Sequence, residues 1–348
     1  MTQIHNNDFL ALTRQHEWSM NGFNLKTDTC LVEVWDTGVL YVEPKDLNTV
    51  QRKKAIVLSS AVHGNETAPI EIVNELITKI LDNELTPSAP VLFMFGNPAA
   101  INVGKRFVEE NMNRLFSGYH SKGVDPQGRE TNNERKRAAK LEEYVTRFFN
   151  KHPDFERTHY DLHTAIRDSA HEKFAVYPYL HGKPWKKEQF EILRAMGVST
   201  VLIMQAPATT FSYYASNTHG AESFTIELGK VRPFGQNDQS KFAAAKNTLL
   251  NLITGIEVEP DQFDANNFQI MEVFRSINRE HVDFRLNFAD DVANFTDFRQ
   301  GDVLAIENGI EIKAEKDGEA IVFPNADVDL GQRALLTVIP TSVAHNLA

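Results

Sequence analysis

Short apolar segments separated by turn residues recur along the first 256 residues of this 348-residue chain. Residues 30–35 alternate between apolar and polar side chains, which is typical of a strand with one solvent-exposed face. Continuous apolar runs at 55–58 and 91–95 predict strands that are buried on both faces. Between these two runs, four residues have the spacing of a single helix face: Ile70, Val73, Ile77 and Ile80.

The same alternation continues to residue 254. Residues 117–133 are rich in glycine and polar side chains and predict a long surface loop. Further strands are predicted around 159–163, 174–177, 200–204 and 224–228, and helices over 130–150, 186–196 and 239–254. Strands that alternate with helices indicate a mainly parallel sheet with helices on both faces.

The pattern changes after Gly255. Short alternating stretches at 310–312 and 320–323 are separated by turn dipeptides such as Asn308-Gly309. We therefore expect two domains, an α/β domain over residues 1–256 and a small β-rich domain over residues 257–348.

The charge distribution supports this division. The chain has 36 Lys and Arg against 47 Asp and Glu, a net charge of −11. Residues 257–348 contain 7 basic and 18 acidic side chains, so they account for the whole excess, and the first 256 residues contain 29 of each. Nucleic acids and anionic membranes require clustered Lys and Arg, and neither is an expected partner.

Three further features bear on location. The chain has no apolar run near the roughly 18 residues of a membrane span. Its first residues lack the pattern of a signal peptide, and its single cysteine, Cys30, fits a reducing compartment. We expect a cytoplasmic protein, and the sequence leaves its oligomeric state open.

The first candidate for chemistry is the segment LSSAVHGNETAP at residues 58–69. A predicted buried strand ends there, and His63 and Glu66 follow in the turn that opens a helix. Ligands of open α/β sheets gather at the carboxyl ends of strands, and imidazole and carboxylate are both good zinc donors. A helix-capping turn with a surface histidine would show the same residues.

The second candidate is the segment THYDLHT at residues 158–164. Side chains two apart on a strand point to the same face, so His159, Asp161 and His163 share one. His163 would supply a third metal ligand, and Asp161 could orient an imidazole. For His159 we favour an ordinary core histidine.

Two more groups follow predicted strands. Glu227 lies near the end of an apolar strand, where it could accept a proton from an activated water or pair with Lys230 or Arg232. Arg106 could polarise a carbonyl, and Asn113 with Arg114 suits a terminal carboxylate, although a basic surface turn would also contain them.

Together, the motifs HGNE, GNPAAINVGKRFVEENMNR, DLHT and IELG resemble the succinylglutamate desuccinylase and aspartoacylase branch of the zinc carboxypeptidase-like superfamily. The similarity covers essentially the whole chain. It implies a three-layer α/β/α sandwich with a mixed, largely parallel sheet and a smaller C-terminal β domain.

The resemblance also implies roles for single residues. His63, Glu66 and His163 match the ligands of one zinc ion per chain, and Glu227 matches the catalytic carboxylate. Arg106 matches the residue that stabilises the oxyanion, and Asn113 and Arg114 match the pair that holds a substrate carboxylate. Asn111 departs from the pattern, because this position is often Asp in the family.

By this resemblance we expect an amide hydrolase for a small anionic substrate, N-succinyl-L-glutamate, in the last step of the arginine succinyltransferase route of arginine catabolism. Lys230 and Arg232 are further candidates for its other carboxylates. The open alternatives are an aspartoacylase-like deacylase, a metallocarboxypeptidase, and a non-catalytic binding protein with the same fold.

Overall fold

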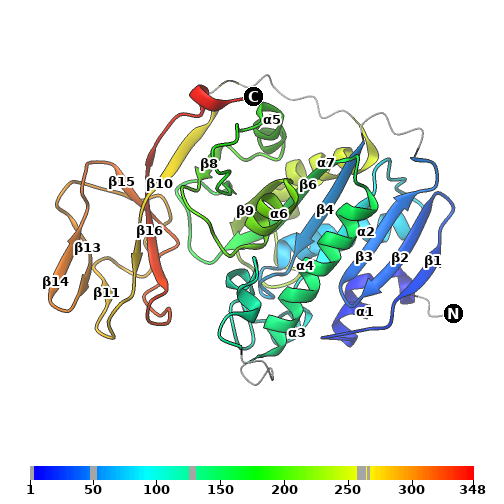
Figure 1. Cartoon of the computed structure of the whole chain (residues 1–348), viewed down its shortest axis with the longest axis horizontal. Coiled ribbons are helices and arrows are strands. Elements are labelled where there is room, and N and C mark those ends of the chain that lie inside the picture. Colours follow the sequence, from blue (N-terminus) through cyan, green and yellow to red (C-terminus); the bar gives the residue numbers. More distant parts are fainter. Residues whose placement is uncertain (1–3, 48–52, 125–130, 257–263, 265–266) are drawn as a thin grey trace.

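A mixed β-sheet with helices on both faces forms the centre of the protein (Figure 1). The computed structural model describes residues 4–47, 53–124, 131–256, 264 and 267–348. The helices are α1 (Phe9–Gln15), α2 (Thr67–Leu81), α3 (Pro98–Val103), α4 (Asn133–Lys151), α5 (Lys187–Ala195), α6 (Phe211–His219) and α7 (Gln239–Thr254), with short 3-10 turns η1 (His5–Asn7), η3 (Met112–Arg114), η4 (Tyr119–Ser121) and η6 (Ala344–Asn346).

The strands of the first two-thirds of the chain are β1 (Phe23–Lys26), β2 (Cys30–Asp36), β3 (Val39–Pro44), β4 (Lys54–Ser60), β5 (Val91–Phe95), β6 (Glu156–Ala165), β7 (Phe174–Tyr177), β8 (Thr200–Ile203) and β9 (Glu222–Lys230). Those that follow are β10 (Gln269–Asn278), β11 (Arg285–Leu286), β12 (Asp297–Phe298), β13 (Val303–Glu307), β14 (Ile310–Lys313), β15 (Glu319–Val322) and β16 (Arg333–Pro340).

In the described residues, thirteen of these strands form one sheet in the order β1-β2-β3-β5-β4-β6-β9-β7-β8-β10-β16-β15-β12. The central pairs β5-β4, β4-β6 and β6-β9 are parallel, whereas the pairs towards β1 are antiparallel. The expected mixed, largely parallel sheet is therefore confirmed for the part of the chain that contains the candidate residues.

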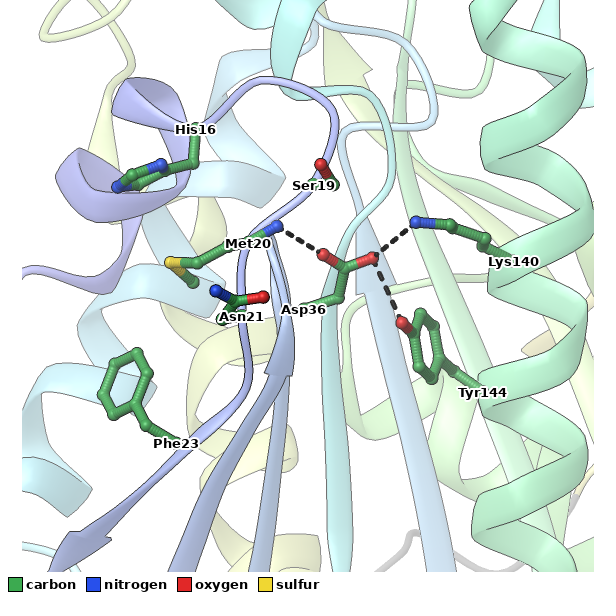
Figure 2. Close-up of a pocket in the computed structure, with 8 residues that line it drawn as sticks. All are labelled: His16, Ser19, Met20, Asn21, Phe23, Asp36, Lys140 and Tyr144. Atoms are coloured by element: carbon green, nitrogen blue, oxygen red, sulfur yellow. Dashed lines mark hydrogen bonds and ion pairs between the residues drawn. The ribbon is translucent and has the colours of Figure 1, made fainter.

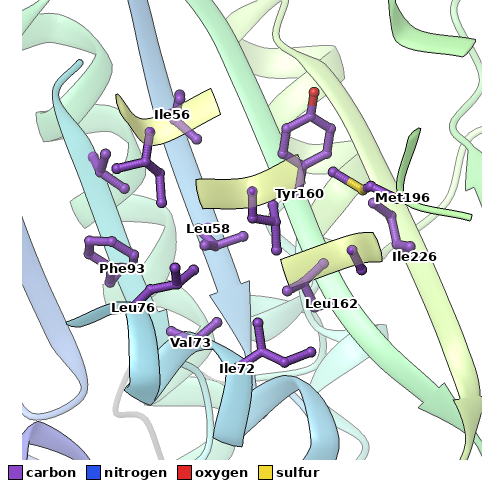
Figure 3. Packing of buried hydrophobic residues seen from close by; sticks show 14 of the residues in the cluster. Ile56, Leu58, Ile72, Val73, Leu76, Phe93, Tyr160, Leu162, Met196 and Ile226 are labelled. Atoms are coloured by element: carbon purple, nitrogen blue, oxygen red, sulfur yellow. The ribbon is translucent and has the colours of Figure 1, made fainter. Parts of the chain in front are cut away.

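Two apolar clusters, one on each face, hold the helices against the sheet. On one face, α2, α5 and α7 pack against the sheet through residues such as Val73, Phe190 and Leu249. Figure 3 shows this packing around α2, where Ile72, Val73 and Leu76 lie against the strands. On the other face, α4 and α6 pack through residues such as Leu141 and Phe211. The predicted α/β/α layering is confirmed.

The C-terminal strands extend this sheet. β10 pairs in parallel with β8 and antiparallel with β16, while β11, β13 and β14 form a separate small sheet. Main-chain hydrogen bonds thus run from the α/β part into the C-terminal β part. The domain division at residue 256 stays a prediction, and residues 257–263 beside it lie outside the described residues.

Two predicted segments differ in detail. The helix expected from residue 130 begins at Asn133, because Asn132 accepts a hydrogen bond from the Arg135 N–H and caps it. The loop expected over 117–133 contains η4, and its residues 125–130 lie outside the described residues. None of the described helices combines the length and apolar character of a membrane span.

Candidate metal and catalytic site

His63 and Glu66 lie in the tight turn between β4 and α2. Both side chains are almost fully buried, with 2% exposure each. Gly64 permits the turn to pack against α3, because a Cβ at this position would lie 2.1 Å from the Ala100 carbonyl carbon. The turn therefore holds both candidate side chains inside the protein, and the exposed histidine of the alternative interpretation is not observed.

His163 reaches the same place from the neighbouring strand β6. Its Nδ1 lies 2.8 Å from Glu66 Oε2, and the Thr164 N–H donates to the same oxygen. One donor atom from each of His63, Glu66 and His163 lies within 4.8 Å of the others. The structure thus brings together the three residues that the sequence predicted as metal ligands.

The geometry between His63 and Glu66 fits a shared ion. His63 Nδ1 is 2.9 Å from Glu66 Oε1, yet the two atoms form no hydrogen bond and Nδ1 has no other partner in the described residues. His63 Nε2 hydrogen-bonds instead with Asn111 Oδ1 at 3.0 Å. When Nε2 carries the proton, Nδ1 presents a lone pair beside the carboxylate, which is the arrangement that a cation requires.

A buried hydrogen-bond network lies behind His163. His163 Nε2 contacts Asp161 Oδ2 at 2.9 Å, and Ser59 donates to Asp161 Oδ1 at 2.6 Å. His159 Nε2 lies 2.7 Å from Ser59 Oγ, so the network reaches a fourth side chain. Asp161 therefore lies where the sequence suggested a carboxylate that orients an imidazole. His159, which the sequence analysis interpreted as an ordinary core histidine, is fully buried and contacts Ser59, the hydrogen-bond partner of Asp161.

Burial and neighbouring charges shift the pKa values of His63, Glu66 and His163. Burial alone would lower the pKa of His163, but the carboxylates of Asp161 and Glu66 outweigh it and hold the pKa well above its usual value. Burial would likewise raise the pKa of Glu66, yet His63 and His163 hold it well below its usual range. Burial and the nearby Arg106 lower the pKa of His63 to about 4. The ionised Glu66 carboxylate and the neutral His63 imidazole are donors suited to a divalent cation, and binding of a cation at His163 would release the proton of its imidazole.

Glu227 lies on β9 directly beside His163. The two residues are paired in register across the parallel strands β6 and β9, so their side chains leave the sheet on the same face. Burial, and next the repulsion from Glu66, raises the pKa of Glu227 to about 7, and its Oε2 has no partner among the described residues. A carboxyl group that titrates near neutral pH suits proton transfer.

Arg106 contacts the cluster from the loop after α3. Its Nη1 lies 2.7 Å from Glu66 Oε1, and its side chain is 31% exposed. A partly exposed guanidinium beside buried donors can reach both the cluster and a bound molecule.

Asn113 and Arg114 lie in η3, which Asn111 caps by accepting from the Asn113 N–H. Asn113 Oδ1 accepts from the Phe211 N–H at the start of α6, and Arg114 Nη1 donates to the Asn113 carbonyl. Both residues are therefore held by the main chain, while the guanidinium of Arg114 has no acidic partner among the described residues.

The two remaining candidates for substrate binding, Lys230 and Arg232, lie away from the contacts of the cluster. Lys230 Nζ pairs with Asp168 at 2.7 Å, and both side chains are largely exposed. Arg232 is exposed, and its carbonyl accepts from Thr67 Oγ1. No contact in the described residues joins Lys230 or Arg232 to the cluster.

A hollow of about 590 Å³ lies elsewhere, between the N-terminal segment and α4. Figure 2 shows Asp36 at its centre, where the carboxylate accepts from the Met20 N–H and the Tyr144 hydroxyl and pairs with Lys140. Because these contacts already compensate its charge, Asp36 links the N-terminal segment to α4.

Comparisons with known proteins agree with this geometry. The model of the succinylglutamate desuccinylase/aspartoacylase catalytic domain matches residues 52–253, and that of the AstE/AspA barrel-sandwich hybrid domain matches residues 266–341. Succinylglutamate desuccinylase of Idiomarina loihiensis is 53% identical over 336 residues, which cover 95% of each chain.

The structure of the chain is also similar to solved structures of succinylglutamate desuccinylases. The crystal structure of succinylglutamate desuccinylase from Vibrio parahaemolyticus superposes with a TM-score of 0.83 at 33% identity, over 96% of this chain and 95% of that one. The enzyme from Chromobacterium violaceum gives 0.81 at 35% identity, over 97% and 98%.

Proposed function

Because the chain belongs to the succinylglutamate desuccinylase/aspartoacylase family, we propose that it hydrolyses N-succinyl-L-glutamate to succinate and L-glutamate. One observation carries the proposal: the buried donors of His63, Glu66 and His163 converge, with the free carboxyl of Glu227 beside them at the same register. We place the reaction last in the arginine succinyltransferase route of arginine catabolism, in the cytoplasm.

We propose that His63, Glu66 and His163 hold one zinc ion per chain. Two observations support a metal ion at this place. The Nδ1 atom of His63 has no hydrogen-bond partner in the described residues. The Nε2 atoms of His63 and His163 are hydrogen-bonded to Asn111 and Asp161, which leaves the Nδ1 atoms to bind the ion. When bound, zinc supplies a Lewis acid that lowers the pKa of water toward about 7 and polarises a carbonyl oxygen.

The chain's own residues carry the proton transfers. Glu227 accepts the proton of the attacking water at its free Oε2 and returns it to the amine nitrogen of the departing glutamate. Arg106 donates to the oxygen of the succinyl carbonyl as negative charge develops there. Asn113 and Arg114 bind one substrate carboxylate and so orient the amide bond towards Glu227.

A comparison of three substrates tests the proposal. The zinc-loaded protein is assayed with N-succinyl-L-glutamate, N-acetyl-L-aspartate and a short peptide, each with and without a chelator. We expect hydrolysis of the first alone, and its loss with the chelator. Preference for N-acetyl-L-aspartate would assign an aspartoacylase-like deacylase instead, and preference for the peptide a carboxypeptidase.

A further inference from the structure

A buried carboxylate outside the metal cluster holds the loop over residues 107–111, which forms neither helix nor strand. Glu134 lies in the first turn of α4 and has 0% exposure. Its Oε1 accepts from the side-chain amide of Asn97 at 2.8 Å. Its two oxygens also accept three consecutive main-chain N–H groups of the loop, each at 2.7 Å, from Val108, Glu109 and Glu110.

These four donors use the full accepting capacity of the Glu134 carboxylate. A carboxylate offers about four lone-pair sites, and Glu134 accepts two hydrogen bonds at each oxygen. Charge-assisted hydrogen bonds of this kind compensate a buried negative charge. A neutral amide at this position could not do the same, because its NH₂ group would face two N–H donors. The loop therefore requires the ionised carboxylate.

Both ends of the 107–111 loop lead to residues of the candidate site. Arg106 precedes the loop, and its Nη1 lies 2.7 Å from Glu66 Oε1. Its carbonyl accepts from the Gly64 N–H at 3.1 Å. Asn111 ends the loop, contacts His63 Nε2 at 3.0 Å, and is followed directly by η3. The main chain that Glu134 fixes thus connects the guanidinium at the metal cluster to the turn proposed to bind a substrate carboxylate.

A second contact between α4 and the loop lies nearer the surface. Arg135 donates to both oxygens of Glu110, at 2.6 and 2.8 Å, but the two side chains are 18% and 32% exposed. Ion pairs that solvent can reach contribute little, whereas the donors at Glu134 are bound to a fully buried group. Glu134 therefore supplies the stronger restraint on the loop.

We propose that Glu134 is a positioning residue for the amide hydrolysis. It fixes the 107–111 loop so that the guanidinium of Arg106 lies where negative charge develops on the carbonyl oxygen. The inference rests on the proposed function, in which Arg106 donates to that oxygen. Because a donor to an oxyanion acts only when it is aligned in advance, a displaced loop would reduce the contribution of Arg106 to the rate.

The test is a double-mutant cycle in the full-length zinc-loaded protein, with Glu134→Gln, Arg106→Met and the combined variant. We expect Glu134→Gln alone to lower kcat about 10- to 100-fold, which is part of the roughly 10²- to 10³-fold loss caused by removal of an oxyanion donor. In the Arg106→Met background, the same substitution should lower kcat less than about threefold, because no guanidinium remains to be positioned.

Three further variants of α4 separate positioning from stability and charge. Val145→Ala removes buried apolar contacts of the same helix, so it should lower Tm and leave kcat unchanged. Glu143→Gln changes an exposed carboxylate of α4 and should behave as the parent protein. Glu134→Asp keeps the charge with a shorter reach, should lose less activity than Glu134→Gln, and replaces it in the cycle if Glu134→Gln does not fold. A loss of kcat in Val145→Ala as large as in Glu134→Gln would reduce Glu134 to a structural role.

Hydrogen exchange separates this inference from the proposed function, because it requires no turnover. The N–H groups of residues 108–110 should exchange about tenfold or more faster in Glu134→Gln, while those of β4 and β6 exchange as in the parent protein. The cycle is run with whichever of the three substrates the parent hydrolyses. Absence of N-succinyl-L-glutamate hydrolysis by the parent would refute the proposed function. Unchanged exchange at residues 108–110, or an equal loss of kcat in both backgrounds, would overturn the role of Glu134.

Discussion

The candidate site has a metal side, formed by His63, Glu66 and His163, and an anion side, formed by Asn113 and Arg114. The two sides differ in whether their charged groups have partners within the protein. On the metal side, each charged group has a partner within the protein: Glu66 contacts two imidazoles and Arg106, and Asp161 accepts from Ser59 and His163. On the anion side, around Asn113 and Arg114, the guanidinium of Arg114 has no acidic partner among the described residues.

This difference in charge compensation favours metal binding on one side and binding of an anionic substrate on the other. Buried ions that are paired and hydrogen-bonded stay fixed in the absence of a ligand, which preorganises a metal site. Unpaired cations destabilise the empty protein and gain most when an anion arrives, which favours binding of a charged substrate. Glu227 shares features of both sides, because it is buried beside the cluster yet its Oε2 has no partner among the described residues.

The largest effect is expected at Glu227. The substitution Glu227→Gln removes the proton acceptor and leaves all three metal donors in place, so turnover should fall about 10²- to 10⁴-fold. Zinc content, measured by elemental analysis, should equal that of the parent protein. His163→Ala serves as the contrast, since it should lose the metal itself. Activity similar to the parent in Glu227→Gln would remove Glu227 from the mechanism.

On the metal side, Ser59→Ala should weaken zinc binding by up to about tenfold, the lower end of the loss typical for a direct partner of a ligand, since Ser59 acts on His163 through Asp161. The reason is that Ser59 joins Asp161 to His159. Ser60→Ala is a close control, because Ser60 follows on the same strand, is equally buried, and its hydroxyl has no partner in the described structure. Competition with a chelator measures both. Equal affinities for the two variants would show that the network does not support the metal.

On the anion side, Arg114→Met should raise KM for N-succinyl-L-glutamate about tenfold or more and also stabilise the substrate-free protein. Removing a partly buried cation that has no acidic partner among the described residues should raise Tm by about 1–3 °C. Arg135→Met provides the control, since Arg135 pairs with Glu110 at 2.6 Å and its loss should lower Tm. A lower Tm for Arg114→Met would mean that this side is compensated after all.

A further effect is a pH dependence of stability in the metal-free protein. The pKa of Glu227 is raised to about 7 in the folded state, so its contribution to stability is present at pH 4 and is lost as pH rises through 7. Glu227→Gln should therefore be more stable than the parent at pH 8, by about 1–3 kcal/mol, and nearly equal to it at pH 5. Urea unfolding at both pH values measures the difference. An equal difference at both values would contradict the raised pKa.

Several elements could be predicted because their signal is local. The buried strands β4 and β5 and the apolar face of α2 follow from runs and spacing within a few residues. Helix α6 was not predicted, since FSYYASNTH contains Ser, Tyr, Asn and Thr, which are poor helix formers. It forms because Phe211, Tyr214 and Ala215 pack into the cluster beneath α4, a contact between distant segments.

The candidate site divides in the same way. His63, Glu66, His163 and Glu227 were predicted as candidates because each follows or ends a recognisable strand. Asn111 was noticed only as a departure from the family pattern, and no neighbouring residue indicates that its amide contacts His63, 48 positions earlier.

The sequence by itself determined the chemical types at the strand ends and the order of the strands and helices that have a clear hydrophobic pattern, because donor chemistry and hydrophobic periodicity are local properties. Only the tertiary structure decided which charges are compensated: the pairing of β6 with β9 brings Glu227 beside His163, and the turn after β4 brings Glu66 to His163 and Arg106. Charge compensation depends on distance in space and on burial, and a linear sequence specifies neither until the sheet has formed.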